Sequence, residues 1–148
     1  MVCGPIEFEQ AQRRDALYAE AEAVYRRYWA EVQRVELSAH PVVTPELEAV
    51  TEPRFRELLR QAFVQAEGRQ RVKGEGSVVW VRRAPGVSRY GSVVAVDACT
   101  DGRNARYRER EGDAEPGGVV EHRLFFTRFG IDAGLRIVGS EFVDVETC

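Results

Sequence analysis

The chain has 148 residues, of which 44% are hydrophobic, 30% charged and 9% aromatic. This size and composition are typical of one globular domain with a hydrophobic core, and they exclude a disordered or collagen-like chain. The formal charge of −3, from 24 acidic and 21 basic residues, provides no overall positive field that would attract nucleic acid. No stretch approaches the ~18 apolar residues of a membrane helix, and Met1 to Gln10 lacks the pattern of an export signal. We therefore expect no nucleic-acid partner and no transmembrane segment.

The first strong pattern is an amphipathic helix that follows a flexible segment of residues 1–10. Apolar residues recur at intervals of three or four positions, at Leu17, Ala21, Val24, Tyr28, Val32 and Val35. This spacing places them on one face of a helix. Because Pro41 disfavours helical backbone at His40, the helix is expected to stop by Ala39.

Two further helices are predicted before residue 70. Thr44-Pro45 places a capping side chain and a first-turn proline at the start of a short helix that contains Leu47 and Val50. A longer helix restarts after Pro53 and ends at Gly68. Its predicted apolar face consists of Phe55, Leu58, Leu59, Ala62, Phe63 and Ala66.

After Gly76 the period of the apolar residues changes from 3.6 to 2, which is typical of β-strands. The predicted strands are Ser77–Arg83, Arg89–Thr100, Arg103–Glu109, Val119–Phe129 and Leu135–Glu146. Short connections such as Asp101-Gly102 favour antiparallel neighbours, the acidic segment 111–118 suits an exposed hairpin loop, and Gly139 marks a position for a bulge. Helices followed by strands indicate the α+β class, with N-terminal helices packed in the concave face of a strongly bent antiparallel sheet of five or six strands.

The three cysteines permit one disulfide and one remaining thiol. If Cys99 ends the second strand and Cys148 the last, and if these strands meet, the two residues can form a disulfide, which would add about 4 kcal/mol of stability. The alternative is that both remain thiols in a reducing cytosol. Cys3 is expected to be idle in a frayed terminus. The cysteines and histidines lack the spacing of a zinc site, so we expect no metal and no cofactor.

Four segments together carry a likeness to known proteins: 23–29 (AVYRRYW), 40–47 (HPVVTPEL), 96–101 (VDACTD) and the terminal Cys148. On these segments the chain resembles the nuclear-transport-factor-2-like and SnoaL-like superfamily, whose fold is a cystatin-like cone. Within it the chain is most similar to small secreted or lipid-anchored actinobacterial proteins. The resemblance implies a single cone-shaped domain over residues 1–148. It also implies a secreted or cell-envelope location, whereas the missing export signal leaves a cytoplasmic or phage-borne protein as the alternative.

The resemblance also suggests where a functional site would lie. Enzymes of this fold usually place a carboxylate and a Tyr or His in the cavity, for which the candidates are Asp97, Tyr107, His122 and Glu141. A hydrophobic ligand pocket would be lined by Tyr25, Trp29, Trp80, Tyr90 and Phe126. For each of these residues a purely structural role in the core or on the surface is the simpler interpretation. Alternate arginines at 106, 108 and 110 share a sheet face, which is either solvated or meets an acidic partner or a phosphate.

Three functions are consistent with these observations. The first is a non-catalytic binding or protein-interaction module, with a protein partner or a small apolar ligand and with the open face of the sheet available for a homodimer. The second is a small enzyme similar to SnoaL or ketosteroid isomerase, acting on an apolar cyclic compound. This enzyme would need a cavity with an inward carboxylate of perturbed pKa beside a Tyr or His. The third is a structural or accessory subunit of a larger assembly, such as that of a phage.

Overall fold

The computed structural model describes residues 4–130 and 133–148, so that Cys3 lies outside the described residues. Three helices come first: α1 (Pro5–Val35), α2 (Pro45–Val50) and α3 (Pro53–Gln65). Each begins with a proline, which suits the first turn because no helical partner exists there for its missing N–H. As predicted, Thr44 caps α2 by accepting a hydrogen bond from the Leu47 N–H at 3.3 Å.

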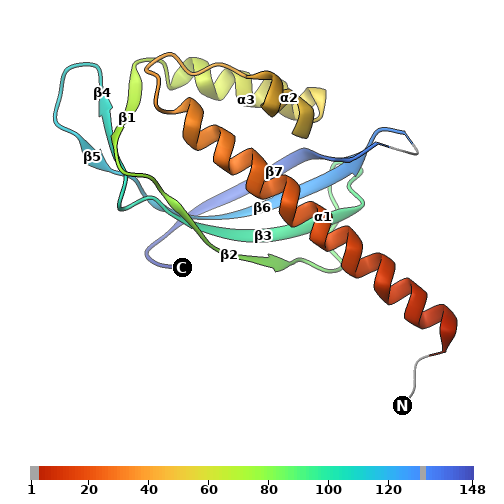
Figure 1. Cartoon of the computed structure of the whole chain (residues 1–148). Coiled ribbons are helices and arrows are strands. Elements are labelled where there is room, and N and C mark those ends of the chain that lie inside the picture. The colour runs from red at the N-terminus through yellow and green to blue at the C-terminus, as the bar shows by residue number, and fades with distance from the viewer. Residues whose placement is uncertain (1–3, 131–132) are drawn as a thin grey trace.

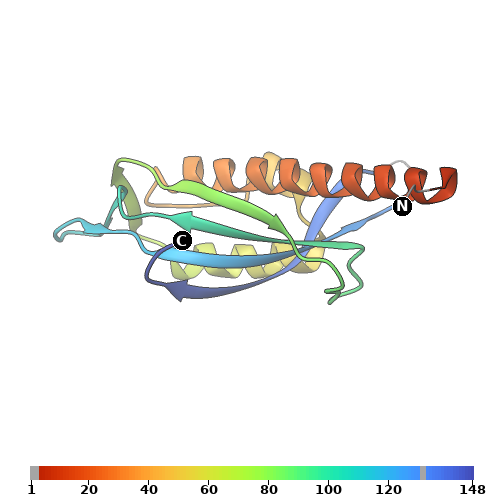
Figure 2. The ribbon, with the colours of Figure 1, turned by 90° about the horizontal axis from the view of Figure 1, so that it is seen from below.

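Helix α1 is longer than its apolar stripe. It begins at Pro5, well before Leu17, and its first turns carry exposed side chains, including Ile6 and Phe8. Figures 1 and 2 show this end of α1 projecting away from the strands. The helix therefore continues through residues 5–10, where the sequence pattern indicates a flexible segment.

The described strands form two antiparallel sheets where one sheet of five or six strands was expected. The main sheet has the order β2-β3-β6-β7, formed by β2 (Ser77–Arg83), β3 (Val94–Asp101), β6 (Val119–Arg128) and β7 (Leu135–Val145). The small sheet has the order β1-β4-β5, formed by β1 (Arg69–Lys73), β4 (Arg106–Glu109) and β5 (Glu115–Pro116). The α+β class is confirmed.

The short connection at Asp101-Gly102 does not join neighbouring strands. Both edges of β3 are already paired, one with β2 and the other with β6. The chain therefore leaves the main sheet at Asp101, and β4 pairs with β1 and β5 instead. The expectation of antiparallel neighbours was wrong here because loop length alone does not say which edges are still free.

Several strands also differ from the prediction: β4 begins at Arg106 and not Arg103, and β5 lies within segment 111–118, which was predicted as a loop. Strand β1, which is mostly polar, was not predicted, and it exists because β4 pairs with it. Residues 89–93, predicted to start a strand, instead belong to a loop that covers one face of the main sheet. Within this loop Tyr90 adopts a φ of 60°, a left-handed conformation that is incompatible with a regular strand.

The helices pack on one face of the main sheet, as Figure 1 shows. The largest core cluster joins α1, α2 and α3 to this face through side chains that include Val24, Tyr25, Val50, Phe55, Val96, Leu124, Phe126 and Ile137. Leu59 on α3 is buried, whereas the neighbouring Leu58, predicted on the same apolar face, is 60% exposed. The inner face of α3 is therefore narrower than its sequence pattern indicates.

The predicted bulge in the last strand is present beside Gly139. The register of β6 with β7 shifts there, because Phe125 pairs with Gly139 and Phe126 with Ile137. A Cβ atom at position 139 would lie 2.4 Å from the ring of Tyr90, which is closer than Cβ atoms approach other heavy atoms in real structures. Glycine is therefore required at this position so that the loop can lie on the sheet.

The predicted disulfide is confirmed. Cys99 on β3 and Cys148 are joined, and their Cα atoms lie 5.8 Å apart. The C-terminal residue also accepts a hydrogen bond of 3.3 Å through its carbonyl from the Trp80 indole N–H. The C-terminal segment is thus attached to the outer face of the main sheet, the face opposite to the helices.

Candidate functional site

A cavity of about 250 Å³ lies between α1 and the strands. Its aromatic wall is formed by Tyr25, Tyr28 and Trp29 on successive turns of α1. Polar side chains from both sheets face this wall, namely Thr100 on β3, Tyr107 on β4 and His122 on β6. An apolar wall with a few polar groups is the usual composition of a site for a small organic molecule.

The Tyr25 hydroxyl lacks a hydrogen-bond partner among the described residues. Its side chain is 99% buried by accessible area, since only 1% of the residue is exposed. Burial also raises the pKa of this phenol above its ordinary value, so the hydroxyl is neutral. A buried hydroxyl without a partner costs free energy, so the hydrogen bond that Tyr25 lacks is a cost in the structure as described.

His122 is the second polar group of the cavity. It shares a hydrogen bond of 3.2 Å between its Nε2 atom and Thr100 Oγ1. Burial lowers the pKa of His122 below its ordinary value of 6.5, so the imidazole is neutral at physiological pH. A neutral imidazole can donate one hydrogen bond and accept another, which makes His122 suitable for contact with an uncharged polar ligand.

Glu36 and Tyr107 form a hydrogen-bonded pair at one end of the cavity. The Tyr107 hydroxyl donates to Glu36 Oε2 at 2.8 Å, and the Gln33 amide donates to the same oxygen at 3.1 Å. Burial is the main cause that raises the pKa of Glu36, while Tyr107, Arg69 and Arg71 act in the opposite direction. Burial likewise raises the pKa of Tyr107 to about 12. The cavity therefore contains an inward carboxylate with a tyrosine within hydrogen-bond reach.

Two glycines make room for aromatic side chains of the cavity. A Cβ atom at Gly117 would lie 3.0 Å from the Tyr107 ring and 2.7 Å from the Gly102 carbonyl oxygen. A Cβ atom at Gly76 would lie 3.3 Å from the ring of Trp29. The segments that close the cavity thus approach its aromatic side chains more closely than other residues would allow.

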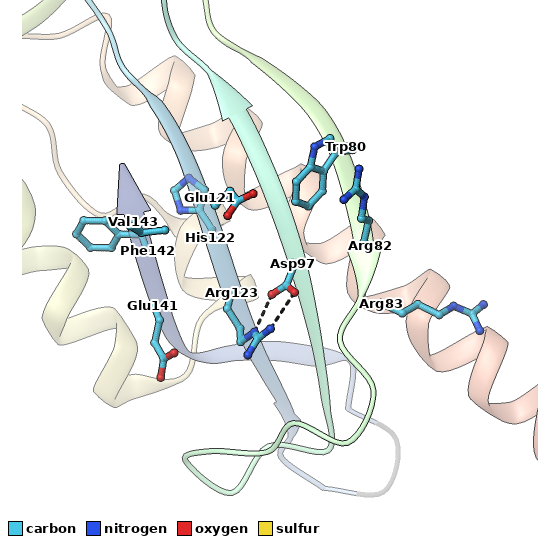
Figure 3. A pocket seen from close by; sticks show the side chains of 10 residues that line it. All are labelled: Trp80, Arg82, Arg83, Asp97, Glu121, His122, Arg123, Glu141, Phe142 and Val143. Atoms are coloured by element: carbon cyan, nitrogen blue, oxygen red, sulfur yellow. Dashed lines mark hydrogen bonds and ion pairs between the residues drawn. The ribbon is translucent and has the colours of Figure 1, made fainter. Parts of the chain in front are cut away.

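A second hollow, of about 510 Å³, lies on the outer face of the main sheet, and Figure 3 shows its lining side chains. Its centre is a row of charges across four strands, because Arg82, Asp97, Arg123 and Glu141 occupy successive paired positions. Arg123 donates to both oxygens of Asp97, at 2.7 and 3.0 Å. Glu141 contacts Arg89, and the Arg82 guanidinium lies 3.9 Å over the Trp80 ring. Each charged side chain of this row already contacts another side chain. A ligand would therefore gain fewer new interactions in this hollow than in the cavity.

The residues predicted for a site lie in several places. Tyr25, Trp29 and Tyr107 line the cavity, Asp97, Glu141 and Trp80 line the hollow on the outer face, and His122 lines both. Tyr90 lies over Gly139, with its ring 5.4 Å from that of Phe125, and lines another hollow between α3 and β7. Phe126 is fully buried in the core. The candidate carboxylates Asp97 and Glu141 therefore share a hollow with His122 but are not brought together with Tyr107.

The carboxylate that does accompany Tyr107 is Glu36, which was not predicted. It follows the last residue of α1 as the C-cap, where a sequence pattern gives an acidic residue no special meaning. Its partner lies 71 positions further along the chain. Only the position of Glu36, one residue after Val35 of the apolar stripe, could have suggested that the Glu36 side chain is half-buried.

No protein-family model, curated protein or solved structure matches this chain.

Two further observations concern other kinds of site. Within residues 4–130 and 133–148, no three His, Cys, Asp or Glu side chains gather in an arrangement that could hold a metal ion. None of the helices in the described part of the chain combines the length and the apolar character that crossing a membrane requires.

Proposed function

We propose that this domain is a non-catalytic binding module with the nuclear-transport-factor-2-like cone fold, and that it takes a small, mostly apolar molecule into the cavity between α1 and the strands. The observation that carries the proposal is that Tyr25, a residue of the cavity wall, has a buried hydroxyl without a partner among the described residues. Helices on one face of a bent antiparallel sheet support the cone fold.

The chemistry of the cavity indicates a neutral ligand. Tyr25 and His122 are both uncharged, and the negative charge of Glu36 is offset by Arg69 and Arg71 nearby. Because Glu36 and the two arginines carry opposite charges, neither an anion nor a cation would be attracted by all of these groups. A phenol or an alcohol can instead share a hydrogen bond with Tyr25 while its apolar part contacts Tyr28 and Trp29.

The probe for a test is 4-ethylphenol, titrated into the protein in a calorimeter. Tyr25→Phe removes the hydroxyl and should weaken binding about five- to tenfold, which is the effect of one hydrogen bond. The same substitution should leave the free energy of unfolding unchanged or raise it, because the lost hydroxyl had no partner. Tyr18→Phe, on the same helix but outside the cavity, is the matched control and should change neither quantity.

The two tryptophans locate the bound probe. Trp29 lines the cavity and Trp80 lies on the outer face, so Trp80→Phe leaves only the reporter in the cavity. Addition of 4-ethylphenol should change the emission of Trp29 in this variant and leave Trp80 unchanged in the Trp29→Phe variant. The proposal fails if 4-ethylphenol does not bind or if Trp80 is the residue that responds.

A second candidate is the small enzyme similar to SnoaL or ketosteroid isomerase, acting on an apolar cyclic compound. It is favoured by the Glu36 carboxylate, whose pKa burial raises, and by its hydrogen bond from Tyr107. A carboxylate with a raised pKa is a stronger base, and here it would remove a proton from the carbon beside a ketone. The test is exchange of the α-protons of 2-tetralone with heavy water, followed by NMR. Exchange above the buffer rate that Glu36→Gln abolishes supports the enzyme, and exchange at the buffer rate rejects it.

A second copy of this chain is the partner that we propose for the outer face of the main sheet. The row Arg82, Asp97, Arg123 and Glu141 alternates in charge. A two-fold axis parallel to the strands, between β3 and β6, would place Arg82 opposite Glu141 of the second copy and Asp97 opposite Arg123. Sedimentation velocity tests this arrangement: Arg123→Asp should shift a dimer toward monomer, and a wild-type protein that sediments as a monomer at all concentrations rejects it.

A further inference from the structure

A third hollow, of about 440 Å³, adjoins the cavity and lies between α3 and β7. It is lined on the α3 side by Phe55, Leu58, Leu59 and Ala62 and on the strand side by Val138, Gly139 and Phe142. We call it the α3–β7 groove. Three residues, Tyr28, His122 and Ser140, line both the groove and the cavity, so the two spaces meet at these side chains.

The groove differs from the cavity in its chemistry. Its lining is mainly aliphatic and aromatic, with Arg54 as its one formally charged side chain among the described residues. Two of its large apolar side chains are unusually exposed, since Leu58 is 60% and Phe142 is 73% exposed. Large exposed apolar side chains beside a cavity are a feature of surfaces that a ligand covers.

We infer that the ligand is an elongated amphiphile, with a neutral hydroxyl-bearing head in the cavity and an alkyl chain in the α3–β7 groove. This inference rests on the proposed binding function and adds the class of the ligand. Tyr25, whose hydroxyl has no partner among the described residues, and His122, which shares a hydrogen bond with Thr100, both line the cavity and are the groups that would place the head there. The shared lining residues then direct the chain past Tyr28 and His122 toward Leu58 and Phe142.

The inference predicts how affinity depends on chain length. Each methylene that leaves water contributes about 0.8 kcal/mol when fully buried, which corresponds to about fourfold in affinity. Because the groove is open on one side, we expect about twofold to threefold for each methylene. The 4-alkylphenols provide the series, with 4-ethylphenol confined to the cavity and 4-heptylphenol reaching the groove. The longer probe should bind at least thirtyfold more tightly in calorimetric titrations.

Variants of the groove separate this effect from general hydrophobic adsorption. Leu58→Gln and Phe142→Gln change exposed side chains, so they should leave the fold intact, and each should weaken 4-heptylphenol binding about fivefold or more. Both should leave the affinity for 4-ethylphenol within a factor of two. Val64→Gln is the matched control, because Val64 lies on the same helix, is 62% exposed and does not line the groove.

The outcomes distinguish this inference from the proposed function. If 4-ethylphenol binds with the expected response of Trp29 but 4-heptylphenol binds no more tightly, the cavity takes the ligand and the inference about the groove is wrong. The inference is also wrong if Val64→Gln weakens 4-heptylphenol as much as Leu58→Gln does. If neither phenol binds, the proposed function itself fails.

Discussion

The hydroxyl of Tyr107 on β4 donates a hydrogen bond of 2.8 Å to the carboxylate of Glu36 at the end of α1. This contact links the small sheet to the C-terminal end of α1. A negative charge at the C-terminus of a helix is unfavourable, because the helix dipole is negative at the same end. The hydrogen bond from Tyr107 and the nearby Arg69 and Arg71 act to lower the pKa of the Glu36 carboxyl, but burial outweighs them and raises it.

Glu36 should make the domain less stable as the pH rises. Its pKa in the folded state is raised, so between pH 4.5 and the folded pKa the native state binds more protons than the unfolded state. The contribution of this group to stability is therefore complete below pH 4.5 and is lost as the pH rises through the folded pKa. In urea titrations from pH 4 to 7, the stability of Glu36→Gln relative to wild type should increase with pH.

Glu20 provides a control of opposite sign for that measurement. The hydrogen bond and ion pair with Arg128 lower the pKa of Glu20, so its contribution is present above pH 4.5 and is lost as the pH falls. The stability of Glu20→Gln relative to wild type should therefore decrease as the pH rises. Equal slopes for the two variants would contradict the assignment of Glu36 as the buried carboxylate.

His122 should titrate below pH 6.5 in the folded protein. Burial lowers its pKa, so the unfolded state binds more protons in this range and the domain loses stability as the pH falls below 6.5. The measurement is the NMR titration of the His122 ring protons, assigned with His122→Gln. A midpoint at or above pH 6.5 would mean that water fills the cavity around the ring.

Gly139 and Tyr90 should be coupled in a double-mutant cycle. Gly139→Ala places a methyl group against the Tyr90 ring and should cost about 1–3 kcal/mol of unfolding free energy. Tyr90→Asn removes the ring and retains a residue that tolerates the positive φ of 60°. In that background Gly139→Ala should cost less than half as much. Equal costs in both backgrounds, measured by urea denaturation, would show that the strand and not the ring requires glycine.

Leu58 and Leu59 should differ strongly in their contribution to stability. Leu59 is 7% exposed and packs in the cluster with Val35, Leu47 and Phe63, so Leu59→Ala should cost about 2–4 kcal/mol. Leu58→Ala removes a side chain that is 60% exposed and should cost less than about 1 kcal/mol. Thermal and urea denaturation of the two variants measure both values. A cost for Leu58→Ala close to that of Leu59→Ala would place Leu58 in the core.

Loss of the disulfide should destabilise the domain by about 2–4 kcal/mol. Cys99 and Cys148 are separated by 49 residues, and the crosslink restricts the unfolded chain. The comparison is best made in a Cys3→Ser background, oxidised and reduced, with alkylation and intact mass to count the thiols. Cys148→Ser should match the reduced protein. If the reduced protein has the same midpoint in urea as the oxidised one, the crosslink contributes nothing to stability.

Local features of the sequence were sufficient to predict the helices and most of the strands. Thr44-Pro45 and Pro53 mark helix starts because capping and the geometry of proline act within one turn. The alternation of Val119 to Arg128 gives β6 almost to the residue, and Gly139 marks the bulge. These signals depend on backbone geometry within a few residues, so they do not require knowledge of the rest of the chain.

The fold class, the starts of α2 and α3 and the two cysteines that pair could be predicted from the residues alone. The pairing of β4 with β1, the exposure of Leu58, and the contact of Glu36 with Tyr107 while Asp97 and Glu141 lie on the other face of the sheet became known from the three-dimensional structure. The physical reason is that a period of two or 3.6 residues fixes which side chains share a face. Which strands pair, and which face the helices cover, depends on competition among segments that are far apart along the chain.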